Sequence, residues 1–214
     1  MFASREDAGR KLGRYLSEEN VRPDIILGLP RGGVVVAAEV ANILQVSLDV
    51  VVVRKIGHPL HREFAVGALA EPDVVVLDES VVGRNPLVRM QLMHVIAEEQ
   101  ERLEKYGETF HRDGLPDFTN KSVLLVDDGL ATGATTEAAV EAVKRKGAGR
   151  VVVAAPVAST NAVERLSRVA DDVRILIVDP DFDAVGRYYE SFSQTTDEEV
   201  LNLLQARVQN QHSA

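Results

Sequence analysis

Residues 123–140, VLLVDDGLATGATTEAAV, decide how this chain folds. Four apolar residues predict a buried strand, and two adjacent carboxylates, Asp127 and Asp128, stand where that strand ends. A loop of small and hydroxyl side chains then leads into apolar residues at helical spacing. In an open parallel sheet ligands bind at the carboxyl ends of strands, so this order of elements indicates a ligand site.

Short β-branched runs separated by helical patterns recur along the chain. Most of the predicted strands are continuously apolar, as in strands covered on both faces; they span residues 24–29, 49–53, 73–77, 122–127, 150–157 and 173–178. Helices are predicted at residues 34–44, 132–146 and 161–169. This alternation predicts an α/β fold with a mostly parallel central sheet flanked by helices.

The segment 85–106 interrupts the alternation. Pro86 stands at a helix-start position and a long amphipathic pattern follows, but the next predicted strand begins only at Ser122. We predict a helical insertion over about residues 85–120 that packs against the sheet or against a partner subunit.

Composition limits the domain count and the class of partner. With 214 residues and 45% apolar content, residues 1–214 are predicted to form a single domain with its core at about 21–178. A net charge of −9 argues against nucleic-acid or membrane-surface binding. The absence of cysteine excludes disulfides, thiolate nucleophiles and cysteine zinc sites. No signal peptide or membrane span is evident, so we expect a cytoplasmic protein.

The acidic pair and the loop after it suggest a ligand with two chemical parts. Adjacent carboxylates can hold a divalent cation, accept hydrogen bonds from sugar hydroxyls, or cap a turn. The loop 131–136 offers free amides and small side chains at a helix N-terminus, which suit a phosphate. A sugar phosphate satisfies both parts. The alternative is a helix capped by Thr132 with no ligand. The sequence motifs of P-loop phosphate sites, dinucleotide sites and hydrolase nucleophile elbows are absent.

The same stretch closely resembles the signature of the type I phosphoribosyltransferases. The resemblance implies that Asp127 and Asp128 contact the ribose hydroxyls of phosphoribosyl pyrophosphate (PRPP). It also implies a loop for the 5′-phosphate made of Ala131, Thr132, Gly133, Ala134 and Thr135.

The sequence GLPRGG at residues 28–33 is similar to the pyrophosphate loop of that family. Gly32 and Gly33 permit a close backbone approach, and Arg31 carries a fork of donors for phosphate oxygens. The resemblance further implies a non-proline cis peptide, which would fall between Pro30 and Arg31.

A third segment, VVVRKIGHPLHREF at residues 51–64, resembles the R-K-x-G-x-P sequence that leads into the flexible loop of purine-type members. Arg54 and Lys55 would then meet the pyrophosphate. His58 and His61 admit a metal-site interpretation, but surface histidines in a loop are the commoner case.

Four of the ten aromatic residues fall between residues 181 and 194. The resemblance implies a C-terminal hood at about 179–196, in which Phe182, Tyr188 and Tyr189 would cover an acceptor base. The alternative is an apolar cluster that seals the sheet edge. Residues 154–160, AAPVAST, lack the lysine with which 6-oxopurine members recognise their base, so the acceptor is not identified.

Taken together, the resemblance implies a phosphoribosyltransferase of nucleotide metabolism, with Arg31, Lys55, Asp127 and Asp128 as the catalytic residues. The expected partners are PRPP, a nitrogenous acceptor and a second copy of the chain in a homodimer. The expected cofactor is Mg²⁺, held by substrate and water rather than by the protein directly. Glu63 and Glu190 are candidates for a general base. The alternatives are a non-catalytic module that senses PRPP or a nucleotide, and phosphate-ester chemistry in the same cradle.

Overall fold

The computed structural model describes residues 1–214 except 79–81, 84–85, 112–115 and 212–214. Its centre is a five-stranded sheet in which every neighbouring pair of strands is parallel. Across the sheet the order is β2 (Ser47–Val50), β1 (Ile25–Gly28), β6 (Ser122–Val126), β7 (Arg150–Ser159) and β8 (Asp172–Asp179). The predicted parallel α/β architecture is confirmed.

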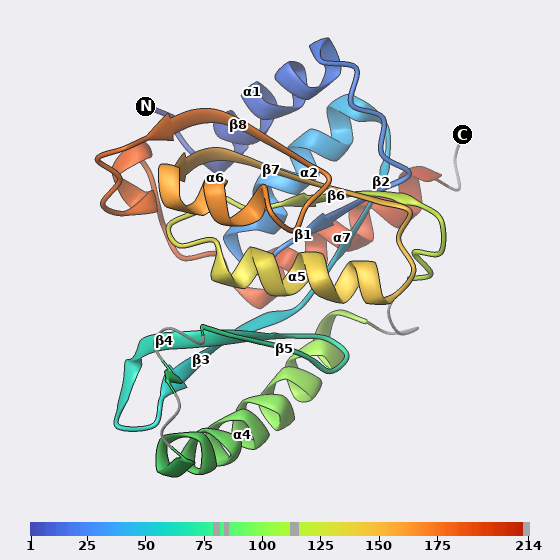
Figure 1. The fold of residues 1–214 in the computed structure, drawn as a ribbon. Helices are drawn as coiled ribbons and strands as arrows, with labels where there is room; N and C mark the ends of the chain where they lie inside the picture. The colour runs from blue at the N-terminus through green and yellow to red at the C-terminus, as the bar shows by residue number, and fades with distance from the viewer. Residues whose placement is uncertain (79–81, 84–85, 112–115, 212–214) are drawn as a thin grey trace.

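Helices cover both faces of this sheet (Figure 1). One face packs against α1 (Arg5–Glu18), α2 (Gly32–Leu44) and α7 (Asp197–Gln211), and the other against α5 (Ala134–Arg145) and α6 (Thr160–Leu166). Alternate residues of β6 point to opposite faces: Leu124 lies in the first core cluster and Leu125 in the second. Both are fully buried, which explains why the sequence of this strand is apolar throughout.

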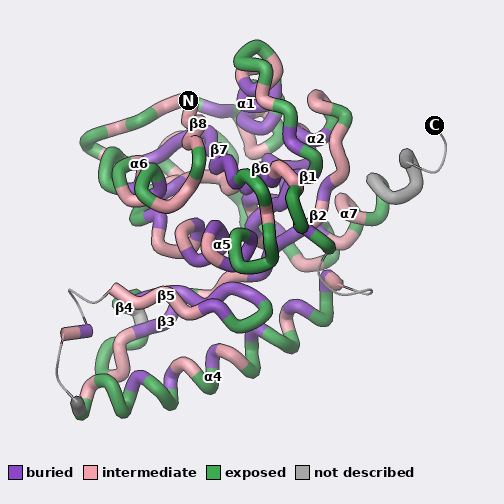
Figure 2. The backbone as a smooth tube through the Cα atoms, turned by 45° about the vertical axis from the view of Figure 1, so that its right-hand side comes forward, coloured by how far each residue is buried: buried purple, intermediate pink, exposed green. Residues whose placement is uncertain are grey.

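A second, antiparallel sheet lies beyond α5 (Figure 1). It consists of β3 (Val53–His58), β4 (His61–Ala70) and β5 (Val74–Leu77), and α4 (Pro86–Phe110) packs against it. Small side chains on α5, Ala138 and Ala142, contact Ala68, Ala70 and Val74 of this sheet. Helix α5 therefore lies between the two sheets. The buried residues lie along the strands and on the helix faces that meet them (Figure 2).

The structure differs from the sequence-based prediction mainly around this second sheet. The predicted strand at 49–53 divides into β2 and β3, and the predicted strand at 73–77 is β5 in the antiparallel sheet. The segment expected to enter a loop after Lys55 forms the β3–β4 hairpin. The predicted insertion at 85–120 contains α4, which is longer than the pattern at 85–106 indicated.

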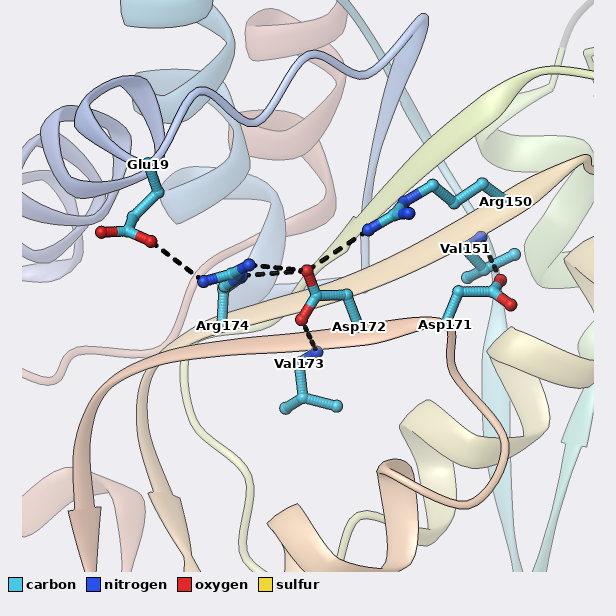
Figure 3. A network of polar contacts seen from close by, with 7 residues as sticks. All are labelled: Glu19, Arg150, Val151, Asp171, Asp172, Val173 and Arg174. Atoms are coloured by element: carbon cyan, nitrogen blue, oxygen red, sulfur yellow. Dashed lines mark hydrogen bonds and ion pairs between the residues drawn. The ribbon is translucent and has the colours of Figure 1, made fainter.

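Helix α1 was not predicted, and its C-terminal end is fixed by ion pairs to the far end of the parallel sheet (Figure 3). Glu19, the C-cap of α1, accepts a hydrogen bond of 3.1 Å from Arg174 on β8. Arg174 also pairs with Asp172 at 2.9 Å, and Arg150 on β7 reaches the same carboxylate at 3.3 Å. This network links the end of α1 to β7 and β8.

Within the part of the chain that the structure describes, no helix combines the length and the apolar character required to span a bilayer.

Candidate functional site

The acidic pair lies where β6 leaves the sheet, next to the loop that follows β1. Strands β1 and β6 are parallel neighbours, so their carboxyl ends meet at the same edge. A Cβ atom on Gly33 would lie 2.9 Å from Oδ1 of Asp127, and one on Gly32 would lie 2.0 Å from Oδ2 of Asp128. Only glycine lets the two loops approach this closely.

The loop after the acidic pair leads into α5 through a left-handed residue. Gly133 is the N-cap of α5 with φ 72°, and a β-carbon is strained in that conformation. Thr132, the cap in the alternative without a ligand, is not the N-cap of the helix, although its hydroxyl accepts a weak 3.4 Å hydrogen bond from the Ala134 amide. The first amides of α5, which belong to the predicted phosphate loop, therefore have no side-chain cap from the N-cap residue.

Burial raises the pKa of both carboxyl groups of the pair. Burial, and then the neighbouring charge of Asp128, raise the pKa of Asp127 to about 8, while the ammonium group of Lys55 opposes the shift. Burial also raises the pKa of Asp128, and the hydrogen bond and charge of Arg5 oppose that rise. The amide of Asp128 donates to Oδ1 of Asp127 at 2.8 Å. Near neutral pH the pair therefore holds a proton that two separate aspartates would have lost.

Arg5 is a site residue that the sequence-based analysis missed. Its Nε atom donates to Oδ2 of Asp128 at 2.7 Å, and both side chains are largely buried. On the opposite side, the hydroxyl of Tyr189 donates to the main-chain carbonyl of Asp128 at 2.6 Å. Arg5 and Asp128 are 123 positions apart, and no local pattern in the sequence links them.

Two cavities adjoin these loops, and Lys55 lines both of them. The smaller, of about 260 Å³, contains the acidic pair and most of the predicted phosphate loop; its wall is Lys55, Asp127, Asp128, Gly129, Leu130, Ala131, Thr132, Gly133, Thr135, Thr136 and Val185. The larger, of about 770 Å³, has Arg31, Arg54 and Lys55 on its wall together with Arg62 and Arg102. The structure thus brings the predicted pyrophosphate-binding cations to one cavity that shares a lysine with the other.

The cations of the larger cavity are held by carboxylates. Arg54 pairs with Glu99 of α4 at 2.7 Å, and Arg102 pairs with the same glutamate. Arg31 lies 3.9 Å from Asp197 at the start of α7. The peptide bond between Pro30 and Arg31 is cis, as the resemblance implied.

The predicted hood lies beside the acidic pair. A short helix, η1 (Val185–Tyr188), places Val185 against Gly129, where a Cβ atom would lie 2.5 Å from Cγ1 of the valine. Tyr188 stacks on Phe182 with ring centroids 5.4 Å apart and donates to Asp179. Tyr189 is instead buried between Phe2 and Phe192. The three predicted acceptor residues therefore divide into one stacked pair and one buried anchor.

Other candidates remain outside this cluster. The rings of His58 and His61 lie 6.0 Å apart near the hairpin turn, and among the described residues no three His, Cys, Asp or Glu side chains are placed to hold a metal. Glu190 is exposed, and the side chain of Glu63 lies outside the described residues.

The chain matches known proteins across nearly its whole length. The family model described as Phosphoribosyl transferase domain matches residues 3–190. Two Mycobacterium tuberculosis proteins, from strains CDC 1551 and H37Rv and each named a candidate phosphoribosyl transferase, are 42% identical over 206 residues. The match covers 95% of this chain but 46% of each relative, so the chain spans about half the length of those proteins.

Solved structures show the same similarity. A crystal structure of a protein from Thermus thermophilus is 43% identical and superposes with a TM-score of 0.81, covering 96% of this chain and 98% of that one. The purine phosphoribosyltransferase of Pyrococcus horikoshii is 20% identical with a TM-score of 0.50, covering 88% and 91%, and shares the fold.

Proposed function

The chain belongs to the phosphoribosyl transferase family of transferase enzymes, and from this premise we propose that it transfers the 5-phosphoribosyl group of PRPP to a nitrogenous acceptor. The observation that carries the proposal is the position of Lys55. It lines both the cavity of the acidic pair and the cavity of Arg31 and Arg54. A ligand with a ribose phosphate at one end and a pyrophosphate at the other suits two such adjoining cavities.

The acidic pair suits the ribose diol. Asp127 and Asp128 offer carboxyl oxygens as acceptors for hydroxyl groups. Because the pKa of Asp127 is raised, the pair carries fewer than two negative charges near neutral pH before a ligand binds. The free amides at the start of α5 and the small residues before them would take the 5′-phosphate.

Charge stabilisation would come from the cations at the pyrophosphate end. The acceptor nitrogen attacks C1 of the ribose while the bond from C1 to the pyrophosphate oxygen breaks, and the bonding electrons leave with pyrophosphate. The proton of the acceptor nitrogen passes to a base or to solvent. Arg31 and Lys55 would stabilise the charge that develops there. They would also fix the pyrophosphate relative to the ribose, so that the reacting atoms are held in line.

The proposal includes Mg²⁺ as a cofactor carried by the substrate. The wall of the larger cavity is rich in guanidinium groups, which bind phosphate oxygens, so the ion would be held by pyrophosphate oxygens and water. When bound, it would neutralise part of the pyrophosphate charge.

The residues of β7 do not specify which base is the acceptor. Ala154, Ala155, Val157 and Ala158, from the stretch without a lysine, are fully buried in β7. No lysine stands in this stretch to recognise a 6-oxopurine. The stacked pair of Phe182 and Tyr188 offers a ring surface for other bases.

A homodimer is proposed on the exposed apolar residues of the second sheet and its helix. Leu87, Met90 and Met93 near the start of α4 are exposed, as are Leu60 and Phe64 of the hairpin. Light scattering after size exclusion tests this: a mass near twice 23.3 kDa is expected, and a monomer contradicts it.

The proposed activity is tested by calorimetric titration with PRPP and Mg²⁺, repeated with a panel of free bases while pyrophosphate release is followed. We expect Lys55→Met to lose release, and Lys105→Met to retain it because Lys105 pairs with Glu101 on the exposed face of α4. PRPP binding without release on any base would identify a sensor instead of an enzyme. No binding of PRPP would contradict the proposal.

A further inference from the structure

Asp128 is contacted by segments from both ends of the chain. Arg5 of α1 donates to its carboxylate, and Tyr189 of the hood donates to its main-chain carbonyl. Gly32, the first residue of α2, lies so close that a Cβ atom there would be 2.0 Å from Oδ2 of Asp128 and 2.6 Å from Nε of Arg5. The carboxylate thus occupies a fixed place between the pyrophosphate loop and Arg5.

Arg5 is itself held on three sides. Besides Nε to Asp128, its Nη1 donates to the carbonyl of Ser193 at 2.7 Å. Its guanidinium carbon lies 3.8 Å from the centroid of the Phe192 ring, a cation–π contact. The side chain is 11% exposed. A planar guanidinium fork can make these contacts together, whereas a lysine ammonium cannot.

The main chain reinforces this arrangement. The amide of Phe2 donates to the carbonyl of Tyr188 at 2.7 Å, and the amide of Glu190 donates back to the carbonyl of Phe2 at 2.8 Å. These two main-chain hydrogen bonds join the segment before α1 to the hood. At the other end of α1, Glu19 pairs with Arg174 of β8 at 3.1 Å, so both ends of the helix that carries Arg5 contact other elements (Figure 3).

We propose that Arg5 is a positioning residue that holds Asp128 as an oriented carboxylate for the ribose of PRPP and links it to the hood. The inference rests on the proposed function, because the ligand is PRPP. Arg5 takes one carboxylate oxygen and leaves the other for a sugar hydroxyl. Since Ser193 and Phe192 hold the same guanidinium, a shift of the hood on an acceptor would alter the contact to the ribose site.

The charges around Asp128 support this role. The groups that face the pair are Asp127 beside it, Arg5 from α1, Lys55 from β3 acting on Asp127, and the hydroxyl of Tyr189 from the hood. Burial favours protonation of Asp128, whereas the hydrogen bond and charge of Arg5, and then the hydrogen bond with Asp127, oppose it. Removal of Arg5 therefore raises the pKa of Asp128 further.

The first experiment compares PRPP affinity in Arg5→Gln, Arg5→Lys and the control Arg10→Gln. Arg10 lies on the same helix, but its ion pair to Glu39 is at the surface. We expect PRPP affinity to fall about tenfold or more in Arg5→Gln, less in Arg5→Lys, and less than about threefold in the control. If Arg5→Gln unfolds, the measurement is made on Arg5→Lys, which keeps the charge. Affinity equal to wild type in the Arg5 variants would overturn the inference.

A double-mutant cycle tests whether Arg5 acts through Asp128. In an Asp128→Ala background, Arg5→Gln should weaken PRPP binding by less than about twofold, because the carboxylate that accepts from Arg5 is already absent. Equal effects of Arg5→Gln in both backgrounds would show that Arg5 acts elsewhere and would overturn the inference.

A measurement without PRPP separates this inference from the proposed function. Carboxyl carbon resonances of ¹³C-labelled aspartate are titrated by NMR in the wild type and in Arg5→Gln. A higher pKa for Asp128 in the variant supports control of its ionisation by Arg5, and an unchanged pKa overturns it. If the wild-type protein does not bind PRPP but the pKa of Asp128 is higher in Arg5→Gln, the proposed function and PRPP as the ligand are both wrong. The control of Asp128 ionisation by Arg5 is still supported in that case.

Discussion

Replacing Asp127 with asparagine is expected to stabilise the protein at high pH. The folded chain raises the pKa of this carboxyl from 3.8 to about 8, because it is buried beside Asp128. A folded-state pKa above the unfolded one means that the folded protein binds a proton more tightly. The resulting stability is full below the ordinary pKa and is lost as the pH rises to the folded value. Asparagine carries no charge and keeps an acceptor for the Asp128 amide.

The magnitude follows from the pH interval. Between pH 5 and pH 8 the wild type loses about 1.4 kcal/mol per pH unit relative to the variant, or about 4 kcal/mol over the interval. Because the carboxyl borders a cavity that water can enter, screening lowers the expected difference to about 2 to 4 kcal/mol. Above the folded pKa the difference should no longer change.

Urea unfolding at pH 5, 6, 7, 8 and 9 measures this difference. The matched control is Asp117→Asn, since Asp117 accepts hydrogen bonds from Thr119 and its pKa is lowered instead. Its effect on stability should be the same at every pH in the series. Parallel stability profiles for the wild type and Asp127→Asn between pH 5 and pH 8 would refute the reasoning.

Three further substitutions test the packing around the site. Gly32→Ala should weaken PRPP binding about tenfold and lower the free energy of unfolding in urea by about 1 to 3 kcal/mol, because its Cβ atom would displace Asp128; unchanged affinity would contradict the close approach. Tyr189→Phe removes the 2.6 Å hydrogen bond to the Asp128 carbonyl and should cost about 1 to 3 kcal/mol by urea unfolding, unless another donor reaches that carbonyl. Leu125→Ala empties a fully buried position in β6 and should cost about 2 to 5 kcal/mol; a cost below about 1 kcal/mol would mean that the core collapses around it.

Local patterns predicted the part of the site that lies on β6 and α5. The apolar run of β6, the acidic pair and the small-residue loop are consecutive, so their strand, turn and helix follow from short-range preferences. Arg31 and Lys55 were also predicted, because each lies in a short segment that resembles the family, and the structure places both on the wall of the larger cavity. What each of these residues binds stays a prediction.

The β3–β4 hairpin could not be predicted in the same way. The polar residues near its turn, which include histidines and arginine, resemble a loop in sequence. The backbones of Gly57 and Arg62 approach closely only when β3 and β4 pair: a Cβ atom on Gly57 would lie 2.2 Å from the carbonyl oxygen of Arg62. Antiparallel pairing depends on cross-strand contacts, which a single strand's sequence does not specify.

The sequence by itself determined the parallel α/β core, the strand that delivers the acidic pair and the family to which the chain belongs, because each depends on residues close together in the chain. Only the tertiary structure decided what surrounds Asp128. Arg5 and Tyr189 reach it from helix α1 and from the hood, across 123 and 61 positions. Contacts at such separations arise when distant segments pack on the same sheet edge, and no local propensity encodes them.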